Sequence, residues 1–285
     1  MKGIKAEIYL LGIVIIWGAT FAIIKDVLDQ IMPFTFLAYR FLLAVLILSV
    51  IFWKKIKDID KIILKKGFLI GIFLFLGYAF QTVGLKYTTA TKAGFITGLS
   101  VVLVPIISYF FIKEKVNRNS VIGVIFATIG LCLLNQNSSF SFNLGDFLVL
   151  LCAVSFAMHI ISVGLYTKKM NCVLLVIVQL TTVFILSLLM ALFFERLDIH
   201  LSYTSNVWWP IILTGVFATA LAFYMQNRFQ RYSTATKTAI LFSGEPIFSA
   251  IFAYLLLGEK VGLIAWIGGL LIIFGMIICQ RKRTE

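Results

Sequence analysis

Charged residues are scarce in this chain of 285 residues: they make up 13% of it, whereas hydrophobic residues make up 61%. A soluble globular domain carries roughly 25% charged residues, and the chain has no long polar segment that could form one. The mean hydropathy of +1.04 therefore indicates an integral membrane protein. The net charge of +13 is spread over short segments between apolar runs. This excludes the single basic face of a nucleic-acid-binding protein, so we expect no nucleic-acid partner.

Motifs for catalysis and metal binding are also missing. The absence of GxxxxGK[ST] excludes an ATP-driven reaction by this chain itself. There is no GxSxG or HExxH, and the two histidines, His159 and His200, are far apart in sequence. The four cysteines lack CxxC spacing, so neither a disulfide framework nor a zinc site is expected. We expect no enzyme activity, no cofactor and no metal.

What the chain does have is a series of ten apolar runs, each about long enough to cross a bilayer as a helix. They cover residues 8–25, 34–53, 67–86, 92–112, 119–135, 145–166, 172–194, 207–227, 235–257 and 262–280. The runs lack the period-two alternation of a membrane barrel, so we expect an all-α membrane protein of ten transmembrane helices. The first run follows basic residues but lacks a convincing small-x-small cleavage site, so we expect a retained helix there.

An internal repeat divides the chain. Residues 81–134 return at 226–279, with an offset of 145 positions and 14 identities over 54 aligned positions. The clearest stretch is Tyr87-Thr88-Thr89-Ala90-Thr91-Lys92 against Tyr232-Ser233-Thr234-Ala235-Thr236-Lys237. Duplicated halves in a membrane protein indicate a transporter fold with its substrate site where the halves meet. We place the two halves at residues 1–138 and 139–285, with five spans in each.

The basic residues predict how the bundle is oriented. With the N-terminus inside, 19 lysines and arginines fall on the cytoplasmic side and 5 on the other, while Arg40 lies within a span. This bias predicts that both termini are cytoplasmic. Because five is an odd number of spans, the second half enters the membrane from the opposite face. The repeat is therefore expected to be an inverted one, which is the arrangement that alternating access requires.

Two charges fall well inside predicted spans, Arg40 in the second and Glu245 in the ninth. Each costs on the order of 2.5–3.5 kcal/mol at a helix centre on insertion scales, so such residues usually face the bundle interior. Three interpretations stay open: a structural ion pair or brace, a substrate site, and proton coupling at Glu245. In a substrate site Arg40 would bind a carboxylate or phosphate and Glu245 an amine. Pro246 follows directly, and it predicts a kink.

Small and aromatic side chains within the spans are further candidates. Gly94 and Gly98 lie on one face of the fourth span, where they allow close helix packing or leave room for a substrate. The aromatic candidates and a lone mid-span histidine are Trp17, Phe21, Tyr78, Tyr224 and His159. Core packing and interhelical hydrogen bonding are the alternatives to a role in binding. Helix packing, within the chain or between subunits, is expected for Gly123, Gly130, Gly268 and Gly275.

Several short motifs together resemble one family. They are Trp17-Gly18-Ala19-Thr20-Phe21, Tyr39-Arg40-Phe41, Gly244-Glu245-Pro246 and Leu257-Gly258-Glu259-Lys260. They resemble the EamA family of the drug/metabolite transporter superfamily, and the resemblance covers essentially the whole chain. It implies a ten-helix, inverted-repeat transporter in a prokaryotic plasma membrane, with both termini cytoplasmic. Members commonly export amino acids and other small metabolites.

The resemblance also implies a binding site. In the family a central cavity is lined mainly by the first, third, fourth, sixth, eighth and ninth helices. Carried onto this chain, the site comprises Trp17, Phe21, Tyr78, Gly94, Gly98, His159, Tyr224 and Glu245. Arg40 completes the expected substrate-binding set, although its recurrence in the family's second helix favours a structural role. The halves differ at the expected centre, where Ser100 aligns with Glu245.

We therefore expect a secondary transporter that exports small metabolites, amino acids or related compounds, by alternating access. Its expected partners are a small-molecule substrate and the lipid bilayer, with proton coupling as one way to drive it. A sugar-phosphate carrier or a drug or cation carrier of the same fold is the alternative. A channel is disfavoured because no filter-like motif is present, and an intramembrane enzyme because no catalytic set can be assembled.

Overall fold

The computed structural model describes residues 2–113, 116–134, 143–195, 203–258 and 262–280, and this part of the chain is helical with no strand. In chain order the helices are α1 (Lys2–Val27), α2 (Pro33–Ile51), α3 (Trp53–Ile56), α4 (Lys61–Leu85), α5 (Ala90–Gly98), α6 (Ser100–Ile112), α7 (Arg118–Leu134), α8 (Leu144–Tyr166), α9 (Cys172–Phe194), α10 (Ser205–Leu213), the π-helix η1 (Thr214–Leu221), α11 (Ala222–Gln230), α12 (Ala235–Phe242), α13 (Glu245–Leu257) and α14 (Leu263–Gln280). Three residues named above, His200, Glu259 and Lys260, lie outside the described part. So do five further residues among the counted lysines and arginines, which are Lys115, Arg196, Arg281, Lys282 and Arg283.

Eight helical segments in the described residues are long and apolar enough to cross a membrane. They are Lys5–Val27, Pro33–Ile51, Lys61–Leu85, Ala90–Ile112, Leu144–Tyr166, Cys172–Phe194, Ser205–Gln230 and Ala235–Leu256. Two shorter apolar helices, Arg118–Leu133 and Leu263–Cys279, match the fifth and tenth predicted spans. Helices satisfy their own backbone hydrogen bonds, which is why apolar runs adopt this form in lipid. The predicted class, an α-helical membrane protein, is confirmed.

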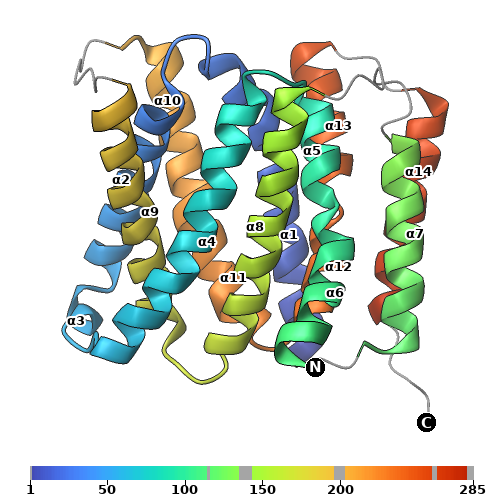
Figure 1. Ribbon diagram of the computed structural model, residues 1–285, viewed down its shortest axis with the longest axis horizontal. Helices are drawn as coiled ribbons and strands as arrows, with labels where there is room; N and C mark the ends of the chain where they lie inside the picture. Colours follow the sequence, from blue (N-terminus) through green and yellow to red (C-terminus); the bar gives the residue numbers. More distant parts are fainter. Residues whose placement is uncertain (1, 114–115, 135–142, 196–202, 259–261, 281–285) are drawn as a thin grey trace.

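The helices stand side by side with their axes roughly upright in Figure 1. Helices from the two halves of the chain pack closely, with α4 against α8 and α9, α2 against α9, and α1 against α13. Helix α1 begins and α14 ends at the same end of the bundle (Figure 1). The pair α7 and α14 lies at one side, next to α5, α6, α12 and α13 (Figure 1).

The two copies of the repeat begin their helices in the same way. The Thr89 side chain accepts a hydrogen bond from the Lys92 backbone N–H at 3.2 Å, and Thr234 accepts one from Lys237 at 3.2 Å. These are N-caps, each of which satisfies a backbone donor that has no partner within the helix. The equivalent helices α6 and α13 also end alike, at a residue with left-handed backbone: Lys113 (φ 53°) in one and Gly258 (φ 68°) in the other. The aligned residues therefore adopt the same local backbone structure in both copies.

Glycines hold α7 and α14 together. A Cβ added to Gly123 would lie 2.9 Å from the carbonyl oxygen of Gly275, and one added to Gly130 would lie 2.5 Å from that of Gly268. Only glycine permits this backbone approach, and lipid supplies no hydrophobic drive to replace it. These glycines thus pack within the chain, which decides between the two alternatives that the sequence left open.

Three of the long apolar segments are not regular α-helices. The fourth span divides at Leu99 into α5 and α6, and the ninth divides at Ser243–Gly244 into α12 and α13. The break before Pro246 confirms the predicted kink. The break at Leu99 has no adjacent proline, and the proline of this span, Pro105, lies inside α6. The eighth span carries the π-helix η1 between α10 and α11. Breaks and π-helical turns in membrane helices commonly mark functional sites.

Candidate functional site

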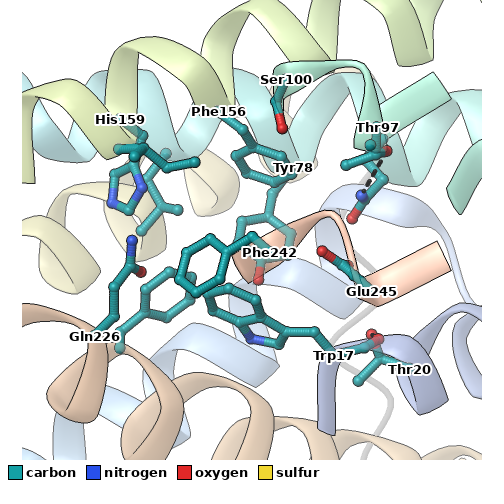
Figure 2. Close-up of a pocket in the computed structure, with 15 residues that line it drawn as sticks. Trp17, Thr20, Tyr78, Thr97, Ser100, Phe156, His159, Gln226, Phe242 and Glu245 are labelled. Carbon is teal, nitrogen blue, oxygen red and sulfur yellow. Dashed lines mark hydrogen bonds between the residues drawn. The ribbon is translucent and has the colours of Figure 1, made fainter. Parts of the chain in front are cut away.

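A cavity opens at the level of the two helix breaks (Figure 2). Its empty space is about 570 Å³ when the open solvent at its mouth is included. We call it the central cavity and define it by its lining residues, which are Trp17, Thr20, Leu74, Tyr78, Gln81, Thr97, Gly98, Ser100, Phe156, His159, Ile160, Phe223, Gln226, Phe242 and Glu245. They come from α1, α4, α5, α6, α8, α11, α12 and α13.

Glu245 is the first residue of α13, and its carboxylate points into the central cavity (Figure 2). It is the one residue with a charged side chain among those that line the cavity. No hydrogen bond or ion pair joins its carboxylate to any other residue that the structure describes, and its side chain is only partly buried. The break delivers this group to the cavity, because the chain turns there and a new helix starts. The positive end of the α13 dipole stabilises the negative charge.

Aromatic rings form most of the wall. The Trp17 indole N–H donates to the carbonyl of Ala218 at 2.9 Å, and its ring lies 5.1 Å from Phe242 and 5.4 Å from Phe223. Because Ala218 belongs to η1, the π-helix fixes the orientation of this ring. Tyr78 continues the wall, with its ring 6.0 Å from Phe223 and in edge-to-face contact with Phe156 at 5.4 Å. Ring faces of this kind bind apolar groups and organic cations.

The polar part of the lining consists mainly of amides, hydroxyls and one imidazole. Gln81 donates to the Thr97 hydroxyl at 3.3 Å, and His159 contacts Gln179 with its Nε2 3.3 Å from the amide oxygen. The Gln226 side-chain nitrogen donates to Gln230 at 3.0 Å. Its own oxygen has no hydrogen-bond partner among the described residues, so it can accept a hydrogen bond from a bound molecule.

Arg40 lies behind the wall of the cavity and not in it. Its side chain is fully buried, with Nε donating to Thr219 at 2.7 Å and Nη2 to the Tyr78 hydroxyl at 3.3 Å. The guanidinium carbon stands 4.7 Å from the Tyr78 ring centroid. Arg40 and Glu245 form no ion pair. The structure therefore excludes a direct ion pair between these two charges and leaves the other interpretations open.

The structure brings five of the nine sequence-predicted site residues together in the central cavity: Trp17, Tyr78, Gly98, His159 and Glu245. The other four lie elsewhere, Arg40 behind Tyr78 and Phe21 in the core. Gly94 faces α13, where an added Cβ would lie 3.0 Å from the Ser249 Oγ atom. Tyr224 faces a separate hollow beside Phe52 and Arg228.

Sequence reasoning missed several lining residues, and the repeat could have found some of them. The offset of 145 relates Tyr78 to Phe223, which is the neighbour of the predicted site residue Tyr224. The same offset relates Thr97 to Phe242 and Gln81 to Gln226, and all four of these residues line the cavity. Phe156 and Thr20 carry no such signal.

Comparison with known proteins agrees with this architecture. The profile of the EamA-like transporter family matches twice, at residues 4–136 and 143–279. An "Uncharacterized transporter" of Archaeoglobus fulgidus is 37% identical over 282 residues, spanning 99% of this chain and 88% of that protein. The "Uncharacterized transporter YyaM" of Bacillus subtilis is 28% identical over 304 residues, spanning 97% and 94%.

A solved structure described as "Crystal structure of protein" shares the fold, with a TM-score of 0.77 and 18% identity over 97% of this chain and 96% of that one. The family profile covers both halves, and the relative at 37% identity extends over almost the whole chain. This chain therefore belongs to the EamA-like transporter family.

Proposed function

We propose that this protein is a secondary transporter that exports small metabolites, amino acids or related compounds, across the plasma membrane by alternating access. The observation that carries the proposal is the position of the central cavity between aligned residues of the two repeat copies. Four aligned pairs line it: Tyr78 with Phe223, Gln81 with Gln226, Thr97 with Phe242, and Ser100 with Glu245. Transporters built from duplicated halves bind substrate at the interface of the repeats, often beside discontinuous helices.

The proposed topology has ten membrane spans, arranged as two inverted halves (residues 1–138 and 139–285) with both termini in the cytoplasm. The shorter helices α7 and α14 would complete the eight longer segments. The start of α1 and the end of α14 at one end of the bundle support an even number of crossings (Figure 1). The excess of basic residues at that end supports a cytoplasmic position for it.

The two ends of the bundle differ in a way that fits one state of an alternating-access cycle. At the proposed outer end Lys92 and Asp146 form an ion pair at 2.6 Å, which joins α5 to α8. The Thr88 hydroxyl donates to the same carboxylate at 2.8 Å, and Lys25 donates to the carbonyls of Leu85 and Thr88 at 2.6 and 2.9 Å. We regard this cluster as a closed outer gate.

At the other end the aligned residue is Lys237, and it forms no ion pair with a residue that the structure describes. Lys237 and Glu7 both lie close enough to Cys279 to interact with it electrostatically. We regard Lys237 and Glu7 as the counterpart of the outer ion pair, unpaired in this state. Closing one gate while the other opens would move substrate without any change in the fold of either half.

The chemistry of the cavity favours some substrates within this class over others. A sugar phosphate needs cations to meet its charge, and none of the residues that line the central cavity is a lysine or arginine. A cation carrier finds support in Glu245, which supplies the opposite charge. No arrangement of nucleophile and base is present among the lining residues, so the proposal includes no chemical change of the substrate.

The proposal is tested with purified protein in liposomes. Radiolabelled amino acids, amines and related metabolites should move down or against an imposed gradient with saturable kinetics, and the product should be recovered unchanged. Liposomes without protein provide the background rate. Folded protein that moves no member of the panel would contradict the proposal, and a rate that does not saturate would favour a channel.

A further inference from the structure

The lining of the central cavity carries negative charge and no positive charge. Of the residues that line it only Glu245 has a charged side chain, and no described lysine or arginine lies among them. The carboxylate makes no hydrogen bond to the rest of the described chain. A bare carboxylate in a cavity walled by rings is costly, and a bound cation would offset that cost. The carboxylate can therefore be neutralised by a bound cation or by a proton.

A backbone carbonyl at the helix break adds a hydrogen-bond acceptor near Glu245. Pro246 has no N–H, so it cannot donate to the carbonyl of Phe242 one turn earlier. The Gln226 side-chain oxygen is a further acceptor without a partner among the described residues. These acceptors suit the three donors of a primary ammonium group.

A carboxylate on the substrate has no equivalent place. Arg40 is the candidate to bind it, and its Nη1 atom has no hydrogen-bond partner among the described residues. Arg40 does not line the cavity, however, whereas Tyr78, which accepts a hydrogen bond from its Nη2 atom at 3.3 Å, does. Arg40 is also held by Thr219 at 2.7 Å. The donors in the lining, such as the Gln81 amide and the hydroxyls of Tyr78 and Ser100, are neutral, so none supplies a positive charge. A substrate carboxylate in this cavity would be buried next to Glu245 without a counter-charge, which costs several kcal/mol.

The aromatic wall of the cavity indicates what the rest of the substrate is. Trp17, Phe223 and Phe242 form one aromatic cluster, with Trp17 at 5.4 and 5.1 Å from the two phenylalanines. Tyr78 and Phe156, 5.4 Å apart, continue this cluster, because Tyr78 also lies 6.0 Å from Phe223. An aromatic or branched apolar group can pack against these rings, and the ring faces also attract a neighbouring ammonium.

We propose that the substrate of this cavity is a small organic amine, bound as its ammonium by Glu245, with an apolar or aromatic group and no carboxylate. This inference rests on the proposed transport function and narrows it from amino acids and related compounds to carboxylate-free amines. Glu245 holds the ammonium, the aromatic rings hold the apolar group, and Arg40 keeps Tyr78 in position as part of the wall.

The test compares four ligands that differ by one group each: 2-phenylethylamine, phenylalanine, 3-phenylpropionate and 2-phenylethanol. Their dissociation constants are measured at pH 7 on detergent-solubilised full-length protein by calorimetry, with thermal unfolding midpoints in parallel. We expect 2-phenylethylamine to bind at least about tenfold more tightly than each of the other three, as the loss of a charged hydrogen bond predicts. Equal or tighter binding of phenylalanine would overturn the proposal, and so would the absence of binding by 2-phenylethylamine, benzylamine and 3-methylbutylamine alike.

Variants localise the effect. In Glu245→Gln the preference for the amine over 2-phenylethanol should fall at least about tenfold, whereas Glu245→Asp should retain part of it. Asp60→Asn serves as the matched control, since it removes one carboxylate at the exposed start of α4 and an asparagine still caps the helix. A folded Glu245→Gln protein with wild-type amine affinity would overturn the proposal. Should Glu245→Gln fail to fold, the ligand series on the wild-type protein still decides it.

The two proposals fail separately. If the amine binds as expected but crosses no liposome membrane, the transport function is wrong and the binding inference stands. If phenylalanine is transported and displaces the amine, the transport function stands and this inference is wrong.

Discussion

The two repeat copies can be compared position by position around their helix breaks. The N-caps at Thr89 and Thr234 have the same 3.2 Å hydrogen bond, and both helices divide at the same aligned place. The side chains beyond the caps differ. Ser100 opens α6 while Glu245 opens α13, and an ion pair ties Lys92 to Asp146 while Lys237 has none with the described residues.

This difference teaches which properties of the repeat depend on the backbone and which on the side chain. Caps, breaks and left-handed turns recur in both copies, because the path of the chain through the bilayer requires them. The charge in the cavity occurs in the second copy alone, and the ion pair at the end of the bundle involves the first. The same backbone structure therefore carries two separate features, the charge in the cavity and the ion pair, and a mutation can remove either one without the other.

The largest expected effect comes from exchanging the aligned residues at the breaks. Glu245→Ser should weaken binding of 2-phenylethylamine by about 10- to 100-fold, because the ammonium loses its charged partner. The double variant Ser100→Glu with Glu245→Ser should recover part of that affinity, since position 100 lines the same cavity. Calorimetric titration measures both. A double variant as weak as Glu245→Ser would mean that the cavity is not symmetric in the way that we infer.

Breaking the ion pair should have the next largest effect. Asp146→Asn leaves Lys92 without its charged partner at a site where Asp146 is fully buried and Lys92 is 13% exposed. We expect a loss of about 2 kcal/mol in the free energy of unfolding, between the values for surface and buried pairs. Denaturant titration of the purified protein checks this.

The aligned Lys237→Gln is the control for that variant, and its free energy of unfolding should change by less than about 0.5 kcal/mol. The outer gate should also open more often in Asp146→Asn, which a cysteine introduced at Thr97 in the cavity would report as faster labelling by an impermeant maleimide. Equal labelling of both variants would contradict the role of this ion pair as a gate.

The part that the copies share can be tested at the glycines. Gly130→Ala places a Cβ 2.5 Å from the Gly268 carbonyl oxygen, and the helices must separate to admit it. The better helix propensity of alanine offsets only part of this strain, so the net loss in stability should be about 1–2 kcal/mol. The thermal unfolding midpoint is the measurement. Gly12→Ala, where an added Cβ meets nothing within 4 Å, should be neutral or stabilising.

The smallest effect should come from the left-handed turns. Gly258→Ala forces a side chain into the region that costs roughly 1 kcal/mol for residues other than glycine, and it should lower stability by about that amount. Lys113→Gly relieves the same strain in the first copy, at φ 53°, and should raise stability by a few tenths of a kcal/mol to about 1. We expect the thermal unfolding midpoint to fall in Gly258→Ala and to rise in Lys113→Gly. A fall in both variants would contradict this assignment of strain.

Sequence predicted much of this molecule because its signals are local. Apolar run length gave the helices, and Pro246 gave the break before α13. Glu245 was identifiable as a candidate because a charge in such a run is costly. What could not be predicted depends on side-chain direction across distant helices. Nothing local indicates that Arg40 turns behind Tyr78 to reach Thr219, which is 179 positions away.

The choice between Tyr224 and Phe223 shows the same boundary. Both are aromatic and adjacent, so composition cannot separate them, yet neighbouring residues on a helix point about 100° apart. Only the offset of the repeat identifies Phe223 as the partner of Tyr78. The π-helix η1, which presents Ala218 to Trp17, had no sequence signal that we recognise.

The glycine contacts between α7 and α14 have a practical consequence. Gly123 meets Gly275 and Gly130 meets Gly268, and exchanging the two copies turns each contact into the other. The two contacts are images of each other, so we expect the pair to stay the same in both states of the proposed alternating-access cycle. The pair can therefore serve as an internal ruler: spin labels on the exposed residues Ile125 and Ile273 should report one constant distance, against which movement of every other helix can be measured.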